Sequence, residues 1–326
     1  MLLKLYLSSL ILDNIWIFYI VVFFVLEMLY LRVALYYGIV DRPNERSSHS
    51  ESVIRGGGII FVLAFVLWSV VNEFVYPYLL FGVLMAALIS FIDDIKSISS
   101  LTRFSVHVLS IGLLLFQLGL FQFSWWLLPL FILLIGIENA YNFMDGINGI
   151  TGFYSLAIFI PIWFTEHDDL LKGFIGTVII SLLVFLFFNA RNKAKCFAGD
   201  IGSISIALML MFVLVNRIIE TKNFSYILVL LFYGIDSSFT IVQRLLGGEN
   251  IFIAHRKHLY QYLVNEFKIP HLLISVGYSG LQLFFNIWLM VFLPSLGIAL
   301  GVSIIIGALY IVLKFHLVKQ INNLAT

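Results

Sequence analysis

Long apolar runs, separated by short polar segments, extend along the whole chain. Eleven of these runs approach the roughly 20 residues with which an α-helix crosses a bilayer. They lie at about 14–37, 57–72, 75–92, 104–120, 125–141, 151–165, 173–190, 201–219, 225–244, 271–293 and 295–315. The pattern predicts an all-α, polytopic integral membrane protein with about eleven transmembrane helices.

The composition agrees with this pattern, because 61% of the 326 residues are hydrophobic and only 11% are charged, with a mean hydropathy of +1.04. The first run is too long for a signal peptide and has no cleavage pattern, so we expect it to remain as a helix. No linker, low-complexity tract or repeat divides the chain, and residues 1–326 are predicted to form one polytopic domain. The single cysteine, Cys196, excludes an intrachain disulfide.

The basic residues predict the orientation of the chain in the membrane. With the N-terminus outside, fourteen of the nineteen Lys and Arg residues fall in inner loops and in an inner C-terminal tail that includes Lys314. Basic loops favour the cytoplasmic side, so we expect an outer N-terminus and a cytoplasmic C-terminus. The basic inner surface suits anionic lipid head groups or phosphorylated substrates. A net charge of only +1 gives no indication of nucleic acid. Acidic residues on the other side, such as Glu166, are expected to be solvated loop charges.

Residues 139–152 interrupt an apolar run with amides, a carboxylate and glycines. Asn139 and Asn142 are three apart and would share one helical face, and Asp145 follows them. Glycines at 146, 149 and 152 would end the helix and let the backbone approach a ligand. The stretch indicates a site for phosphate, sugar or base. A glycine-rich turn with capping Asn and Asp residues is the alternative.

The loop at 41–58 is polar and ends in three glycines at the start of the second apolar run. His49 and Arg55 add positive charge, and Gly57 would let a ligand approach the backbone, so the loop could form an anion site. An ordinary basic inner loop followed by a small-residue packing face explains it equally well.

Adjacent carboxylates occur at the end of the third apolar run, where Asp93 and Asp94 are followed by Lys96. Neighbouring like charges favour a divalent cation, and Mg²⁺ takes one or two carboxylates plus phosphate oxygens and waters. An ordinary helix end is the alternative, although acids there oppose the helix dipole. Asp200, between two glycines in a Gly-Asp-x-Gly-Ser segment, is a second candidate metal ligand or else an N-cap.

Two further groups lie later in the chain. Asp236 falls within the ninth apolar run, where an ionisable group indicates a function. It could line a polar cavity, or pair with a neighbouring helix through Arg32 or a hydroxyl. His255, Arg256 and His258 form a candidate cationic cluster suited to phosphate.

Helix counting places these motifs on one face of the membrane, and together they resemble the polyprenyl-phosphate N-acetylhexosamine-1-phosphate transferases, the superfamily of MraY and WecA. That family's motifs match the loop at 43–58, Asp93 with Asp94, the Asn-x-x-Asn-x-x-Asp-Gly at 139–146, the Gly-Asp-x-Gly-Ser at 199–203, and Asp236. Two departures occur. Asn148 stands where the family often repeats an acid, and the terminal cluster lacks a pair of adjacent histidines. This form is similar to the WbpL-like branch, which starts O-antigen or related surface polysaccharides, and it disfavours MraY.

The resemblance implies an enzyme that moves an N-acetylhexosamine 1-phosphate, or a 6-deoxy relative, from a UDP-sugar to undecaprenyl phosphate and releases UMP. It implies the cytoplasmic face of a bacterial inner membrane, with Mg²⁺, or Mn²⁺ in its place, on Asp94 and Asp200. The implied catalytic residues are Asp93, Asp94, Asp145, Asp200, His255, Arg256 and His258. The implied substrate-binding residues are His49, Arg55, Gly57, Lys96, Asn139, Asn142, Asn148, Asn189 and Asp236. A transporter is the competing class, but its site would lie near the membrane midplane.

Overall fold

The computed structural model describes residues 2–43, 51–121, 125–250 and 255–325, with side chains described for residues 15–321 and 323 of these ranges. Most of these residues are helical, with almost no strand, which confirms the predicted all-α polytopic class. The elements are α1 (Leu2–Tyr37), β1 (Val40–Asp41), β2 (Val53–Ile54), α2 (Ile59–Val71), α3 (Pro77–Ile95), α4 (Ser100–Gln117), α5 (Leu127–Met144), α6 (Ile150–Thr165), α7 (Asp169–Asn189), α8 (Gly199–Thr221), the 3₁₀-helix η1 (Phe224–Leu230), α9 (Leu231–Leu246), α10 (Leu259–Asn265), α11 (His271–Phe292) and α12 (Leu296–Ala325).

Nine segments in the described part of the chain are long and apolar enough to cross a membrane. Two shorter apolar helices, α2 and α6, occupy the remaining two sequence-predicted runs. The eleven predicted runs therefore coincide in position with helices. The number of crossings and the orientation of the chain stay predictions.

Local sequence explains where α4, α6 and α8 begin. The Ser99 hydroxyl caps α4 by accepting from Thr102 N at 3.1 Å. Both α6 and α8 begin at glycines with left-handed backbone, Gly149 at φ +83° and Gly199 at φ +72°. A side chain would strain these two turns, so the glycines fix where α6 and α8 enter the bundle.

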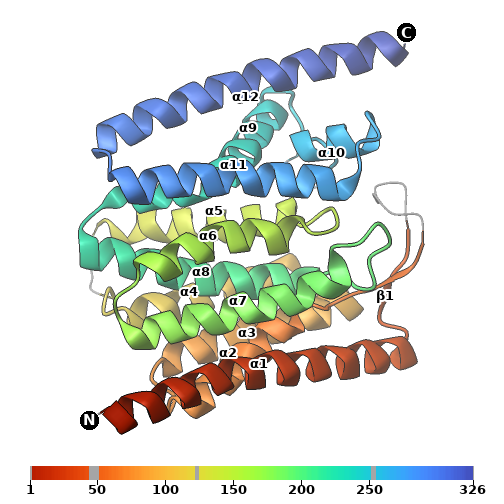
Figure 1. Cartoon of the computed structure of the whole chain (residues 1–326). Helices are drawn as coiled ribbons and strands as arrows, with labels where there is room; N and C mark the ends of the chain where they lie inside the picture. Colours follow the sequence, from red (N-terminus) through yellow and green to blue (C-terminus); the bar gives the residue numbers. More distant parts are fainter. Residues whose placement is uncertain (1, 44–50, 122–124, 251–254, 326) are drawn as a thin grey trace.

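The helices lie roughly along one direction and stack in layers from α1 to α12 (Figure 1). Helix α8 lies at the centre, where 89% of the residues in its apolar stretch are buried. The corresponding share is 22% for α1 and 11% for α12. Helix α3 packs against α8 and α4, while α6 packs against α11 and α7. The exposed apolar faces of α1 and α12 suit contact with lipid.

The short polar segments gather at one end of the bundle (Figure 1). There β1 pairs with β2 in antiparallel register, Val40 opposite Ile54. A parallel bridge between Ile54 and Cys196 joins this hairpin to the segment before α8. The α5–α6 turn and α10 lie at the same end, so the fold brings the sequence-predicted motifs to one region.

Two expectations for charged residues are wrong. Lys314 does not belong to a polar tail, because it lies within α12 with 1% exposure and its Nζ donates to Thr240 Oγ1 at 2.6 Å. Glu166 is not a solvated loop charge, because its buried carboxylate pairs with Arg217 Nη1 at 3.3 Å and accepts from the backbone N–H of His167. Arg217 also donates to Thr165 O, so this ion pair ties the start of the α6–α7 loop to α8.

Candidate active site

Asp94, in the last turn of α3, bonds directly to the first turn of α8. Its two carboxylate oxygens accept from Asp200 N at 3.2 Å and Ile201 N at 3.4 Å. A Cβ at Gly199 would lie 2.6 Å from Asp94 Oδ2, so only glycine permits this approach. The acid opposes the dipole of its own helix, but the amide end of α8 offsets that cost. The amides of 200 and 201 are therefore occupied by a protein carboxylate.

Arg55 connects the loop before α2 to two carboxylates. Its Nε lies 2.8 Å from Asp94 Oδ1 and its Nη2 lies 3.8 Å from Asp200 Oδ1. Burial alone would lower the pKa of Arg55, but the charges of Asp94 and Asp200 outweigh it and raise the pKa. Tyr30 on α1 donates to Arg55 O at 2.6 Å and fixes the backbone at this point. The guanidinium thus supplies the positive charge between the two acids.

Arg103 on α4 makes a second, similar bridge. Its Nη1 lies 2.7 Å from Asp93 Oδ2 and 3.8 Å from Asp200 Oδ2. The other oxygen of Asp93 accepts from Ile98 N at 2.7 Å, which fixes the turn between α3 and α4. Asp200 therefore lies between two arginines. Its side chain is 23% exposed whereas that of Asp94 is fully buried, so Asp200 is the more accessible of the two carboxylates.

The triple glycine before α2 packs against the start of α8. Gly57 N donates to Phe197 O at 2.8 Å and Gly58 N donates to Ala198 O at 3.0 Å. A Cβ on Gly58 would lie 2.2 Å from the Cα of Gly202. These contacts favour the packing alternative for Gly57, since its amide is already bonded within the chain. His49 lies outside the described residues.

Asp145 ends α5 and is half-buried. Burial is the main reason that its pKa is raised to about 6. The Thr151 hydroxyl, donating at 2.6 Å, and the charge of Arg55 lower this pKa, while the negative charge of Asp200 raises it. Tyr260 approaches from α10, where its hydroxyl donates to Phe143 O at 3.0 Å and would lie 2.2 Å from a Cβ on Gly146.

Asn148 and Asn189 hold the glycine turn in place. Asn148 Nδ2 donates to Arg191 O at 2.7 Å, while Asn189 accepts from Gly149 N at 2.6 Å and donates to Cys196 O at 2.8 Å. Both side chains are at most 5% exposed. These bonds give both side chains a role in holding the turn, and the substrate contact implied by the resemblance stays a prediction.

The remaining polar residues of this region are more open. Asn139 is exposed and donates to Ile135 O of its own helix, and Asn142, one turn nearer the glycine turn, is half-buried. Lys96 is exposed at the end of α3. Substrate contact by these three residues stays a prediction.

Asp236 is fully buried in α9 and holds the segment that contains His258. Its Oδ1 accepts from His258 Nδ1 at 3.1 Å and from Leu259 N at 3.2 Å. Tyr278 of α11 donates to Oδ2 at 2.8 Å, and Tyr310 of α12 donates to Oδ1 at 2.9 Å. Of the two partners considered from sequence, the hydroxyl is therefore correct and Arg32 is not.

His258 begins α10 and is 2% exposed. Its backbone N–H donates to Gln261 Oε1 at 3.1 Å, and its ring lies between those of His255 and Tyr260. With Nδ1 bonded to Asp236, Nε2 is buried and has no partner among the described residues. Buried polar atoms are normally bonded, so Nε2 is a candidate for contact with a ligand.

The predicted three-cation cluster is only partly supported. Burial and the charge of His258 lower the pKa of His255 to about 4, so His255 is neutral at pH 7. Arg256 Nη2 lies 3.5 Å from Glu266 Oε1, at the end of α10. Of the three predicted cations, Arg256 is therefore the permanently charged one, and a bound polyanion would have to raise the pKa of His255 before that residue contributed charge.

The carboxylates of this region could ligate a divalent cation only together with other ligands. Among the described residues, no group of three or more His, Cys, Asp or Glu side chains forms a ready metal site. Mg²⁺ needs only one or two carboxylates when phosphate oxygens and waters complete its shell. Asp200 meets that need, and Asp94 would meet it in competition with Arg55. The residues fit an ion shared with a diphosphate.

Sequence reasoning missed a buried hydrogen-bonded pair close to this site. His107 Nδ1 on α4 lies 2.8 Å from Glu138 Oε1 on α5, and Glu138 is 2% exposed. His107 lies one helical turn beyond Arg103, so the pair forms a polar layer next to the arginine bridge. An acid within the fifth apolar run was the available signal.

Comparison with known proteins gives matches over the same region. A family model described as glycosyl transferase family 4 matches residues 76–217, from the start of α3 almost to the end of α8. The chain is 26% identical over 265 residues to a Bacillus subtilis protein named probable undecaprenyl-phosphate N-acetylglucosaminyl 1-phosphate transferase, a match that covers 74% of this chain and 73% of that protein.

Two other relatives are named phospho-N-acetylmuramoyl-pentapeptide-transferase. The chain is 30% identical over 181 residues to the protein of Thermotoga neapolitana and 29% identical over 196 residues to that of Streptococcus thermophilus. Each match covers 48% of this chain, with 58% of the first relative and 56% of the second. The chain therefore spans a little over half the length of these two proteins.

Proposed function

Since the chain belongs to the polyprenyl-phosphate N-acetylhexosamine-1-phosphate transferase superfamily, we propose that it transfers an N-acetylhexosamine 1-phosphate from a UDP-sugar to undecaprenyl phosphate. An oxygen of the acceptor phosphate attacks the phosphorus that bears the sugar. The bond from that phosphorus to the UMP oxygen breaks, and UMP leaves. The observation that carries this proposal is the group formed by Asp94, Arg55 and Asp200, where α3, the loop before α2 and α8 meet.

The negative charge of the two substrates exceeds the positive charge that the site supplies. The donor diphosphate brings about two negative charges, and a phosphate monoester brings about 1.5 to 2 more at pH 7. Facing them are two guanidinium groups, Arg55 and Arg103, already paired with Asp93, Asp94 and Asp200. The site therefore requires a further cation, and we assign Mg²⁺, or Mn²⁺, to Asp200 with Asp94. When bound, the ion would neutralise charge on the diphosphate.

The protein's own groups are left with orienting the substrates. Arg55 and Arg103 contact Asp200 from two sides. Asp93 fixes the turn between α3 and α4, and Arg103 lies in α4 just after this turn. His258, held through Nδ1 by Asp236, presents Nε2 as a donor to a phosphate oxygen when the ring is protonated. We assign Asp145 with Asn142 to the nucleotide or sugar. An acceptor phosphate that is mostly ionised at neutral pH needs no general base.

The proposal also covers the location of the protein in the cell and the pathway in which it acts. We propose a bacterial cytoplasmic membrane with the polar end of the bundle facing the cytoplasm, because the inner loops hold most of the basic residues. The WbpL-like form of the histidine segment favours an initiating step of O-antigen or another surface polysaccharide. Transfer of a phospho-muramoyl-pentapeptide is the second candidate, supported by the relatives that carry that name.

A substrate panel separates these candidates. Purified protein would be incubated with undecaprenyl phosphate, Mg²⁺ and one UDP-sugar at a time, including UDP-MurNAc-pentapeptide, and UMP would be measured. We expect UMP only when both substrates are present, with an N-acetylhexosamine donor preferred. Asp200→Asn should abolish release, whereas Asp169→Asn, an exposed acid in the first turn of α7, should not. Failure of every donor to yield UMP would refute the proposal.

A further inference from the structure

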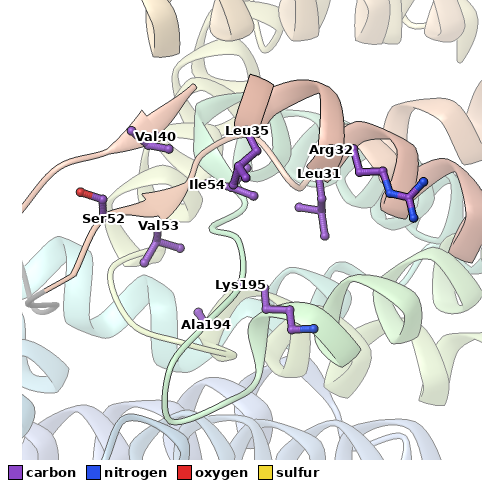
Figure 2. A pocket seen from close by; sticks show the side chains of 9 residues that line it. All are labelled: Leu31, Arg32, Leu35, Val40, Ser52, Val53, Ile54, Ala194 and Lys195. Carbon is purple, nitrogen blue, oxygen red and sulfur yellow. The ribbon is translucent and has the colours of Figure 1, made fainter. Parts of the chain in front are cut away.

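A pocket with a volume of about 430 Å³ lies beside the candidate active site. It is lined by the end of α1, by the hairpin of β1 and β2, and by the segment before α8 (Figure 2). Most of the wall is apolar, including Leu31, Leu35 and Val53. The volume falls in the range of ligand pockets.

Two cations, Arg32 and Lys195, complete the lining. Arg32 comes from α1 and Lys195 from the segment before α8, with the Leu31 side chain between them (Figure 2). Both residues are exposed, and neither has a carboxylate within ion-pair distance in the described part of the chain. Lys195 Nζ contacts only the face of the Phe188 ring, 6.0 Å from its centre. Their charges are therefore available to an anion.

The pocket opens near the end of an apolar helix. The membrane-length part of α1 ends at Tyr37. Tyr36 and Tyr37 are 85% and 72% exposed and form an edge-to-face pair. Exposed tyrosines at the end of an apolar helix are typical of the boundary between lipid tails and head groups. Leu35, on the pocket wall, is 66% exposed and would reach the acyl chains.

We propose that this pocket binds one anionic phospholipid. The head-group phosphate lies between Arg32 and Lys195, and an acyl chain follows Leu31 and Leu35 along α1. A single phosphate with an attached apolar chain matches two cations beside an apolar wall at this depth.

The bound lipid would also affect the neighbouring site. Ile54 forms part of the pocket wall and bridges to Cys196, and the next residue, Arg55, contacts Asp94 and Asp200. A lipid against β2 would hold the strand from which Arg55 projects. The substrate phosphates, in contrast, are assigned to the arginines that face the acids.

Native mass spectrometry of the detergent-purified protein tests the proposal. Phosphatidylglycerol and phosphatidylcholine would be titrated against wild type, against Arg32→Gln with Lys195→Gln, and against the control Lys319→Gln, an exposed cation of α12. We expect wild type to bind phosphatidylglycerol more tightly than phosphatidylcholine. The double variant should bind phosphatidylglycerol about 25-fold more weakly, roughly fivefold for each charge. The control should match wild type.

A parallel titration with undecaprenyl phosphate distinguishes the phospholipid from the acceptor. We expect its affinity to be the same in wild type and in the double variant. Unchanged phosphatidylglycerol binding in the double variant would overturn the proposal, as would a loss confined to undecaprenyl phosphate. Because binding is measured without turnover, this outcome does not depend on the proposed reaction.

Discussion

Replacing Asp236 by asparagine should lower the maximal rate strongly while the protein still folds. The buried carboxylate accepts hydrogen bonds from His258 Nδ1, Leu259 N and the hydroxyls of Tyr278 and Tyr310. Asparagine keeps the shape and one oxygen acceptor but loses the charge. His258 then loses the partner that fixes its tautomer and the direction of Nε2.

The size of the effect follows from that one bond. A hydrogen bond to a charged group contributes about 1.5 to 3 kcal/mol, compared with about 0.5 to 1.5 kcal/mol for a neutral pair. The His258–Asp236 bond is 3.1 Å long and both side chains are at most 2% exposed, so solvent does not replace it. The difference is about 1 to 1.5 kcal/mol. If that difference is expressed in the transition state, kcat falls about 5- to 13-fold.

A double-mutant cycle separates a role through His258 from a general loss of structure. UMP release would be measured at saturating substrates for Asp236→Asn, for His258→Ala and for the double variant. We expect the double variant to be no slower than the worse single variant, a coupling of at least about 1 kcal/mol. Tyr278→Phe is the control, because it removes one hydrogen bond to the other oxygen and leaves the His258 bond in place. It should change kcat by less than about threefold.

Two results would refute this reasoning. If the two single effects simply multiplied, Asp236 would not act through His258. If Tyr278→Phe were as damaging as Asp236→Asn, the acid would serve only to hold the helices together.

Three further predictions follow from the geometry of the site. Arg55→Gln frees Asp94, so Mn²⁺ binding measured by electron paramagnetic resonance should tighten at least about fivefold while UMP release slows; unchanged binding would show that Arg55 does not compete with the ion. The folded-state pKa of Asp145, about 6, lies above its ordinary value of 3.8, so the wild type loses stability as pH rises from about 4 through about 6. The melting temperature of Asp145→Asn relative to wild type should accordingly rise between pH 4.5 and 7, and a pH-independent difference would contradict the buried-acid account. Gly58→Ala should cost about 1–3 kcal/mol, since the new Cβ meets the backbone of Gly202 at 2.2 Å. Gly234→Ala, with no atom within 4 Å, should melt at the wild-type temperature or slightly above it, and equal losses in the two variants would show that the close approach is unimportant.

Much of the helical arrangement could be predicted from the sequence. Each apolar run coincides with a helix because the length needed to cross a bilayer is a local property of the chain. The short helix α10 and the strands β1 and β2 were not predicted, since they depend on distant contacts. Strand β2 is held partly by the bridge from Ile54 to Cys196, and α10 begins at a histidine bonded to Asp236 in another helix.

The candidate site also combines features that the sequence predicts with features that depend on distant contacts. Acids at helix ends could be found by their position, and the structure brings Asp94 and Asp200 together. The pairing of these acids with Arg55 and Arg103 could not be predicted, because it depends on how α2, α3, α4 and α8 pack. Lys314 is a lysine within an apolar run, which is a signal for burial that the count of basic residues does not use. The family model and the named relatives support the superfamily, whereas the roles of individual residues stay predictions.

The most direct test of the central claim follows the phosphorus atom itself. A UDP-N-acetylhexosamine labelled with ³²P in the sugar-linked phosphate would be incubated with the purified protein, undecaprenyl phosphate and Mg²⁺, and the lipid and water phases would be separated. The proposed reaction predicts that the label enters the lipid phase while unlabelled UMP appears in equal amount in the water phase. Label remaining in the water phase as UDP, with only the sugar in the lipid phase, would contradict transfer of a sugar phosphate.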